Sequence, residues 1–326
     1  MAHYLLTGAA GFIASRVASL LLDDGHTVVG VDNLNDAYDV ELKRWRLGQL
    51  EGRPGFRFYQ RDITRREELR DPEIADQPFA AVINLAARAG VRPSVQNPWI
   101  YQETNVTGTL NLLELCRERG IGKFVLASTS SLYGNRHPLP YREDLPTDFP
   151  LSPYAASKKS AEVLCATYQH LHGIDVSVLR YFTVYGPASR PDMSPFRFVQ
   201  RIAEGRPITV YGDGRQSRDF TYVDDIARGT IAAIRPLGYE IINLGSDTPF
   251  ELIAMIRLVE QLTDREAQID YKPAHAADMP RTWADIGKAT SLLGWRPQVG
   301  FEQGFANLVA WYRENRAWAK DISTVD

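Results

Sequence analysis

Short runs of apolar residues alternate along most of this chain with longer segments of mixed polarity. The runs are almost continuously apolar, which is typical of strands buried on both faces of a parallel sheet. The segments 12–24, 97–119 and 154–172 between them carry apolar residues at helical spacing. Seven runs predict strands, at 3–8, 27–33, 57–63, 81–87, 123–128, 175–181 and 240–246.

This alternation of strands and helices predicts an α/β protein with a Rossmann-type, doubly wound parallel sheet, because crossovers between parallel strands are right-handed. From about residue 182 prolines and glycines become frequent, and helical patterns at 195–205, 251–263 and 301–317 predict a smaller α/β C-terminal domain. The stretch "DFTYVDDIARGTIAAI" and the run that follows it predict a return to the main sheet. We therefore expect a dinucleotide-binding domain at 1–181 plus about 219–247, and a substrate domain at about 182–218 plus 248–326.

Composition narrows the class of protein. The 326 residues carry a net charge of −3 without a basic stripe, so we expect no nucleic-acid partner. No apolar stretch reaches the roughly 18 residues of a membrane span, and the chain starts without a signal-peptide pattern. The only cysteines are Cys116 and Cys165, too few for a disulfide framework or a cysteine zinc site. These features predict a soluble, cytoplasmic protein without a metal.

The first strand is followed by "LLTGAAGFIASRV", in which Gly8, Gly11 and Ala14 are spaced as in a dinucleotide-binding turn. Small residues there let backbone N–H groups and a helix N-terminus approach a pyrophosphate. A plain tight turn is the alternative. Asp32, which ends the second strand, favours the cofactor, because a carboxylate there accepts hydrogen bonds from the adenosine ribose and repels a 2'-phosphate. We expect NAD rather than NADP, with Arg16 as a reservation.

Other strand ends add candidates for cofactor contact, because ligands of open α/β sheets bind at the carboxyl edge. Asp62 and Ile63 end the third strand, and the "NLAA" segment ends the fourth; both could instead be turn formers. The full expected cofactor set is Gly8, Gly11, Phe12, Ile13, Asp32, Asn33, Asp62, Ile63, Leu85, Ala86, Ala87, Tyr154, Lys158 and Tyr181.

The segment "SPYAASKKSAE" places Tyr154 and Lys158 four residues apart, on one face of a predicted helix. A tyrosine that acts as a base must lower its pKa from about 10 to about 7, which is worth about 4 kcal/mol. At about 6 Å and an effective dielectric of about 20, a lysine supplies on the order of 3 kcal/mol. We expect Lys158 and an oxidised nicotinamide to share this task.

Together these motifs resemble the extended short-chain dehydrogenase/reductases of the nucleotide-sugar epimerase/dehydratase family, over nearly the whole chain. The resemblance implies that Tyr154 is the base for the sugar 4-hydroxyl and that Lys158 holds the nicotinamide ribose. It also implies that Thr129, in "ASTSSLYG", shares the proton. A Ser/Thr cluster that satisfies backbone groups is the alternative and suits Ser128 and Ser131 better. A homodimer formed through the helical patterns at 98–119 and 155–172 is a further expectation.

The branch of the family follows from the groups near the reacting carbon. Where this chain has Ser130 and Ser131, dehydratases carry a motif that resembles Thr-Asp-Glu-Val-Tyr-Gly. Decarboxylases typically carry Glu in place of Ser131. Neither carboxylate is present. The segments "DNLNDAYDVELKRWRL", "AGVRPSVQNP" and "YFTVYGPASRPDM" resemble UDP-glucuronate 4-epimerases, whereas UDP-galactose 4-epimerases usually have Asn where Thr183 stands. The implied reaction is 4-epimerisation of UDP-glucuronate to UDP-galacturonate with NAD retained.

A 4-keto uronic acid is a β-keto acid, which loses carbon dioxide when its carboxylate bond lies perpendicular to the ketone plane. An arginine can hold that carboxylate through paired, charge-assisted hydrogen bonds. Arg190 is our candidate, with Thr183 and Ser130 as further hydrogen-bond partners. The alternative is a surface loop arginine paired with Asp192.

Arg92 is a further expected substrate contact. For the nucleotide end of the substrate the resemblance implies Arg218 and Asp278, with Arg215 and Arg281 as nearby reserves. The family often has an arginine where this chain has His275. Three other functions stay open: a 4-epimerase of a neutral UDP- or dTDP-hexose, a UDP-glucuronate decarboxylase, and a non-catalytic NAD-binding sensor.

Overall fold

The computed structural model describes residues 1–274 and 279–324 and is built around one large parallel sheet. Its strand order is β10-β6-β5-β4-β1-β2-β3, and all neighbours are parallel. This order is that of a doubly wound sheet, so the predicted fold class is confirmed. The strands are β1 (His3–Thr7), β2 (Thr27–Asp32), β3 (Phe56–Gln60), β4 (Ala81–Asn84), β5 (Lys123–Thr129), β6 (Asp175–Tyr181) and β10 (Tyr239–Leu244).

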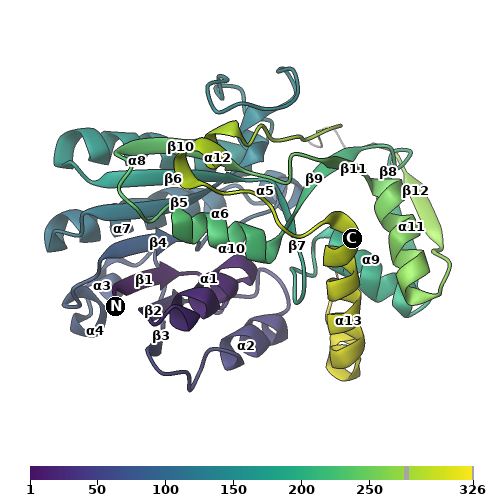
Figure 1. Cartoon of the computed structure of the whole chain (residues 1–326), viewed down its shortest axis with the longest axis horizontal. Helices are drawn as coiled ribbons and strands as arrows, with labels where there is room; N and C mark the ends of the chain where they lie inside the picture. The colour runs from purple at the N-terminus through teal and green to yellow at the C-terminus, as the bar shows by residue number, and fades with distance from the viewer. Residues whose placement is uncertain (275–278, 325–326) are drawn as a thin grey trace.

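Helices cover both faces of this sheet (Figure 1). One face packs against α1, α10 and α12 and the other against α3, α4, α7 and α8, and each face has its own buried apolar cluster. The strands are apolar on both sides because both sides are covered. The helices of this part are α1 (Phe12–Asp23), α2 (Val40–Gly48), α3 (Arg66–Leu69), α4 (Pro72–Ala75), α5 (Val91–Gln96), α6 (Trp99–Tyr101), α7 (Gly108–Arg119), α8 (Pro153–His172), α10 (Val223–Ala232) and α12 (Gly287–Leu293), with a 3-10 turn at Ser130–Tyr133.

The helical pattern at 97–119 is not one regular α-helix. A π-helical segment, Gln102–Thr107, separates α6 from α7. Within it Asn105 bonds both backbone groups of Arg88, at 2.9 and 3.0 Å, and the Ser157 hydroxyl, at 2.9 Å. Single π-helical turns often occur at functional sites. This one ties the loop after β4 to α8, and apolar periodicity carries no sign of it.

The second part of the chain forms a smaller α/β layer beside the main sheet. A three-stranded sheet has the order β11-β9-β7, and β8 pairs with β12. Tyr185, Phe220, Phe301 and Phe305 form an aromatic core there. The elements are β7 (Thr183–Tyr185), α9 (Ser194–Ala203), β8 (Ile208–Tyr211), β9 (Ser217–Tyr222), β11 (Pro249–Glu251), α11 (Leu252–Thr263), β12 (Ile269–Lys272) and α13 (Phe301–Ala319).

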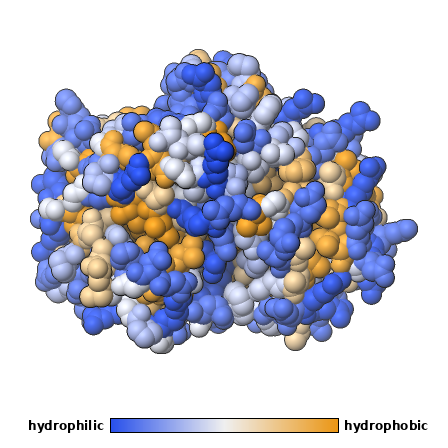
Figure 2. Space-filling model, viewed as in Figure 1, coloured by the Kyte–Doolittle hydropathy of each residue, from blue (hydrophilic) through white to orange (hydrophobic). Residues whose placement is uncertain are grey.

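The chain crosses between the two parts more than once. After β9 in the smaller sheet, α10 packs on α1 and β10 pairs with β6 in the main sheet. The buried carboxylate of Asp219 in β9 accepts the backbone N–H groups of Ser246, Asp247 and Ala284. Hydrophilic residues run down the middle of the face seen in Figure 2, with apolar surface on either side. The exact domain boundaries stay a prediction.

Candidate active site

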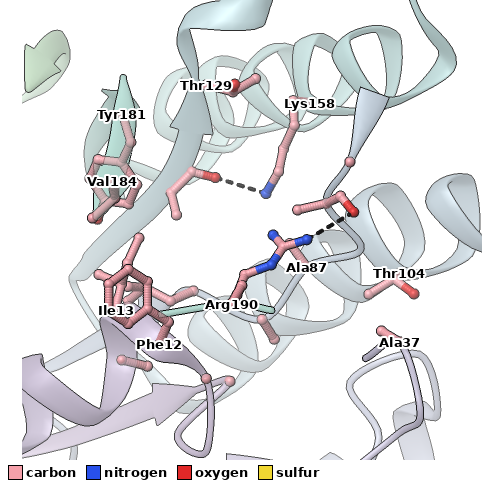
Figure 3. Close-up of a pocket in the computed structure, with 18 of the residues that line it drawn as sticks. Phe12, Ile13, Ala37, Ala87, Thr104, Thr129, Lys158, Tyr181, Val184 and Arg190 are labelled. Atoms are coloured by element: carbon pink, nitrogen blue, oxygen red, sulfur yellow. Dashed lines mark hydrogen bonds between the residues drawn. The ribbon is translucent and has the colours of Figure 1, made fainter. Parts of the chain in front are cut away.

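A cavity of about 340 Å³ lies at the carboxyl edge of the main sheet and reaches the 183–193 segment (Figure 3). It forms there because parallel strands end at a common edge and their loops diverge. The predicted residues that line it are Gly8, Gly11, Phe12, Ile13, Asp32, Asn33, Asp62, Ile63, Leu85, Ala86, Ala87, Thr129, Ser130, Tyr154, Lys158, Tyr181, Thr183 and Arg190. The fold therefore brings together the residues proposed for catalysis, for the cofactor and for the sugar carboxylate.

The glycine turn has the shape that a dinucleotide requires. Gly8 has φ +71°, and a Cβ there would lie 2.8 Å from the Ala86 nitrogen. Gly11 precedes α1, and its N–H donates to the Gly8 carbonyl at 2.7 Å. A side chain at Gly8 would thus press into the loop after β4. The turn leaves room for a ligand at the N-terminus of α1, which favours anions.

Asp32 ends β2 and is nearly buried beside this turn. Its carboxylate accepts the backbone N–H groups of Ala10, at 3.3 Å, and Leu34, at 2.8 Å, which fix its orientation at the cavity wall. Arg16 is turned away and bonds Asp224 of α10 through two nitrogens, at 2.7 and 3.0 Å. The reservation that Arg16 raised about NAD therefore has no geometric support. The glycine cradle and this acceptor fit an NAD-type adenosine ribose and pyrophosphate.

Tyr154 and Lys158 lie on the first two turns of α8, which begins at the Ser152 N-cap. The Lys158 ammonium donates to the Ala127 carbonyl at 2.9 Å, and burial lowers the pKa of Lys158 to about 8. Burial raises the pKa of Tyr154, while hydrogen bonding by Thr129 and the charge of Arg190 lower it. The chain alone therefore holds the pKa of Tyr154 above its ordinary value, because desolvation outweighs the nearby positive groups.

Behind Lys158 lies a buried ion pair that the sequence reasoning missed. Arg180 of β6 donates to both carboxylate oxygens of Glu162, at 3.0 and 2.9 Å, and both side chains are only 2% exposed. Glu162 also accepts from the Ser128 hydroxyl at 2.6 Å and raises the pKa of Lys158. Arg180 is thus a structural partner and does not line the cavity. The available signal was Glu162, one helical turn after Lys158.

Arg190 reaches the same cavity from the loop after β7. Its Nε bonds Asp192 Oδ1 at 3.1 Å, its Nη2 bonds Oδ2, and Nη2 also bonds the Ala89 carbonyl at 3.4 Å. The pair with Asp192 that we held as the alternative is therefore present. It does not place Arg190 on the outer surface, because the side chain is 23% exposed and lines the cavity (Figure 3).

The loop between β2 and α2, together with the start of α2, supplies a cavity wall that the sequence reasoning did not assign. Asn35, Tyr38 and Lys43 line the cavity. The Tyr38 ring lies 5.2 Å from the Lys43 ammonium and 5.8 Å from the Arg190 guanidinium. Burial lowers the pKa of Lys43, while the Asp32 carboxylate raises it. The wall thus gathers positive charge beside the cofactor position.

The other described residues expected to bind the substrate lie outside this cavity. The Arg92 guanidinium of α5 stacks 3.8 Å from the ring centroid of Tyr211 at the end of β8. Arg218 of β9 donates to the Ser217 carbonyl at 2.9 Å, and Arg215 is exposed beside Asp213. Asp278 and His275 lie outside the described residues.

No helix among residues 1–274 and 279–324 is long and apolar enough to cross a membrane. In the same residues no group of His, Cys, Asp or Glu side chains is arranged to hold a metal ion.

Comparison with known proteins shows the family of this chain. Residues 4–245 match the NAD dependent epimerase/dehydratase family. A UDP-glucuronate 4-epimerase of Thermodesulfobacterium geofontis is 55% identical over 323 residues, which cover 99% of each chain. The crystal structure of the Bacillus cereus UDP-glucuronic acid 4-epimerase with UDP-glucuronic acid and NAD superposes with a TM-score of 0.89 at 36% identity, covering 96% of this chain and 99% of that one. A Thermotoga maritima UDP-glucose 4-epimerase with UDP-glucose gives 0.88 at 31% identity, with the same coverage.

Proposed function

The chain belongs to the NAD dependent epimerase/dehydratase family, and from that premise we propose that it interconverts UDP-glucuronate and UDP-galacturonate by epimerisation at carbon 4. NAD is its resident cofactor. The relative with 55% identity over almost the whole length of both chains carries this activity in its name. The fold itself does not discriminate, since the uronate and the neutral-sugar enzymes superpose almost equally well.

The observation that carries the proposal is the position of Arg190 beside the catalytic group. Arg190 and Tyr154 line the same cavity, and the charge of Arg190 lowers the pKa of Tyr154. A sugar whose 4-hydroxyl meets Tyr154 has its carbon 6 substituent nearby. A guanidinium there suits a carboxylate, because charge-assisted hydrogen bonds are stronger than neutral ones. Thr183 and Ser130 line the same region and add neutral hydrogen-bonding groups.

The residues of α8 and β5 divide the proton transfer between them. Tyr154 takes the proton of the sugar 4-hydroxyl, and Thr129, whose hydrogen bond lowers the pKa of that tyrosine, passes it on. Lys158 holds the nicotinamide ribose, and its ammonium is positioned by the Ala127 carbonyl. When bound, NAD accepts the hydride from carbon 4 and returns it to the opposite face. Gly8, Gly11 and Asp32 hold its pyrophosphate and adenosine ribose.

The strand end beside the sugar argues against two other outcomes. Ser130 and Ser131 line the cavity where the dehydratase and decarboxylase motifs place carboxylates. Without an acid and a base there, neither loss of a hydroxyl nor assisted loss of carbon dioxide has a group to carry its proton. The strand end thus offers no group that assists either outcome.

We assign the nucleotide end of the substrate to the boundary between the two parts of the chain. Arg92 from the main layer meets Tyr211 from the smaller layer there, and Arg218 lies on β9 beside the 279–282 segment. Asp278 stays part of this proposal from the sequence alone. The substrate would thus be bound by both predicted domains.

We further propose a homodimer that works in the cytoplasm, where nucleotide sugars and NAD are available. The support is a set of exposed apolar side chains on α5, α6 and α8, which pack together as one helical layer. Trp99 is 76% exposed, and Val95, Val163 and Leu171 are each more than half exposed. Such a surface is typical of a protein interface. Light scattering of a Trp99→Glu variant would show monomers if this layer forms the contact.

The experiment that tests the activity is incubation of the purified protein with UDP-glucuronate, followed by proton NMR of the sugar. We expect galacturonate signals without added reductant, and their absence would refute the assignment. The second candidate is a neutral-hexose 4-epimerase, which the similarity to the Thermotoga maritima enzyme favours. An Arg190→Ala variant separates the two. The variant should lose turnover of UDP-glucuronate if Arg190 binds the carboxylate. If the native substrate is a neutral hexose, it should keep full turnover of that nucleotide hexose.

A further inference from the structure

The guanidinium of Arg190 is held in one plane by three separate segments. Asp192 accepts from Nε and Nη2, the Ala89 carbonyl accepts from Nη2 at 3.4 Å, and the Tyr38 ring lies 5.8 Å away. The side chains of Arg190 and Asp192 are 23% and 19% exposed, so solvent screens their attraction only in part. An arginine otherwise rotates about several bonds. Here that rotation is restricted before a substrate arrives.

The loop that carries both residues is itself anchored. The N–H of Met193 bonds the Arg190 carbonyl at 3.2 Å, which turns the chain so that Asp192 lies back against Arg190. The buried guanidinium of Arg46 donates to the Ala188 carbonyl from Nε and Nη2, at 3.0 and 2.7 Å. Ala188 has φ +53°, a conformation that a non-glycine residue rarely adopts without such support. The position of the pair is therefore determined by α2 as well as by its own loop.

The two charges of the pair face different surroundings. Arg190 lines the cavity, whereas Asp192 is absent from the described residues that line it. Asp192 occupies the Nε edge of the guanidinium, and within the described chain Nη1 makes no hydrogen bond. Asp192 thus fixes the edge formed by Nε and Nη2, and the donors of Nη1 remain for a ligand in the cavity.

A fixed guanidinium matters because of the side reaction open to a 4-keto uronate. In that reaction the bond between carbons 5 and 6 breaks, its electron pair forms an enolate with the carbon 4 ketone, and carbon dioxide leaves. A proton from water then replaces carbon 6 on carbon 5. The step is fast only when the breaking bond is perpendicular to the ketone plane. An arginine can fix the orientation of the carboxylate only if its own guanidinium does not rotate freely.

We infer that Asp192 is a positioning residue that holds Arg190 in the plane that keeps the substrate carboxylate from aligning for decarboxylation. The inference rests on the proposed function. Asp192 also leaves the resting pair electrically neutral, so its role is orientation of the guanidinium rather than attraction of the substrate. Loss of Asp192 should therefore raise decarboxylation of the 4-keto intermediate more than it changes the binding of UDP-glucuronate.

The test compares Asp192→Asn with wild type and with a matched control, Asp144→Asn. Asp144 forms the same kind of pair, with Arg142 two residues before it, at 3.1 and 3.0 Å, but that pair is exposed and outside the cavity. Each protein is given UDP-glucuronate, and NMR measures UDP-galacturonate against decarboxylated UDP-pentose products. Calorimetry measures the dissociation constants of UDP and UDP-glucuronate.

We expect Asp192→Asn to raise the pentose fraction about fivefold or more, equivalent to about 1 kcal/mol of lost orientation. UDP binding should be unchanged and UDP-glucuronate binding should not weaken, whereas Asp144→Asn should match wild type. An equal pentose fraction in the two variants would overturn the inference, as would parallel weakening of UDP and UDP-glucuronate in a folded Asp192→Asn protein.

If Asp192→Asn does not fold, Asp192→Glu decides the question, because it keeps the charge and displaces the carboxylate by one methylene. A pentose fraction above wild type supports the positioning role, and a fraction equal to wild type rejects it. Failure of the proposed function is recognised separately, since wild type would then leave UDP-glucuronate unchanged.

Discussion

The buried pair of Glu162 and Arg180 makes a strong prediction, because its two partners should affect Lys158 in opposite directions. Both side chains are 2% exposed and joined by two hydrogen bonds. Removing one member of such a pair leaves an uncompensated buried charge and costs about 3–5 kcal/mol of unfolding free energy. We therefore expect this loss in both Glu162→Gln and Arg180→Met, measured by urea unfolding.

The consequence for Lys158 follows from the charges that remain. In Glu162→Gln two buried cations lose their carboxylate, so the pKa of Lys158 falls further below about 8. In Arg180→Met the Glu162 carboxylate loses its other cation and interacts with Lys158 alone, so the pKa of Lys158 rises. The alkaline limb of the kcat/KM profile should move to lower pH in the first variant and to higher pH in the second.

The double variant Glu162→Gln/Arg180→Met tests whether the two residues act as a pair. It should be destabilised by clearly less than the sum of the single changes, since no unpaired charge is left. The exposed Asp144→Asn variant, in contrast, should cost less than about 1 kcal/mol. Additive losses, or alkaline limbs that move in the same direction in both single variants, would refute this reasoning.

Three further predictions concern the cavity itself. Tyr154→Phe should lower epimerisation about 10²- to 10⁴-fold in an NMR rate assay while NAD binding by calorimetry is kept; a smaller loss would point to another base. Gly8→Ala should abolish NAD binding, because φ is +71° and the new Cβ would lie 2.8 Å from the Ala86 nitrogen; calorimetry showing wild-type affinity would contradict it. Burial lowers the pKa of Lys158 from 10.5 to about 8, so between those values the unfolded chain binds the proton more tightly and stability rises with pH. Urea unfolding at pH 8 and pH 10 should show this rise, on the order of 3 kcal/mol, in wild type relative to Lys158→Met; an equal response in both would refute it.

The fold followed from the sequence because its signals are local. Each buried parallel strand is an apolar run, so 3–8 and 175–181 could be recognised independently of their neighbours. The site followed for a related reason. Parallel strands end at one edge, so residues at strand ends, such as Asp32 and Asp62, were expected to meet, and both line the cavity. The π-helical segment around Asn105 left no such trace, because its geometry comes from contacts with Arg88 and Ser157.

The sequence by itself determined the order of strands and helices, the glycine turn and the pairing of Tyr154 with Lys158, because each depends on residues close together in the chain. Only the tertiary structure decided what Arg180 and Arg190 do. Arg180 of β6 pairs with Glu162 of α8 and is buried, whereas Arg190 pairs with Asp192 and lines the cavity. The groups around each arginine come from segments that are distant in the sequence. The role of a charged side chain depends on the protein groups that take the place of its hydration water, so the sequence alone does not show it.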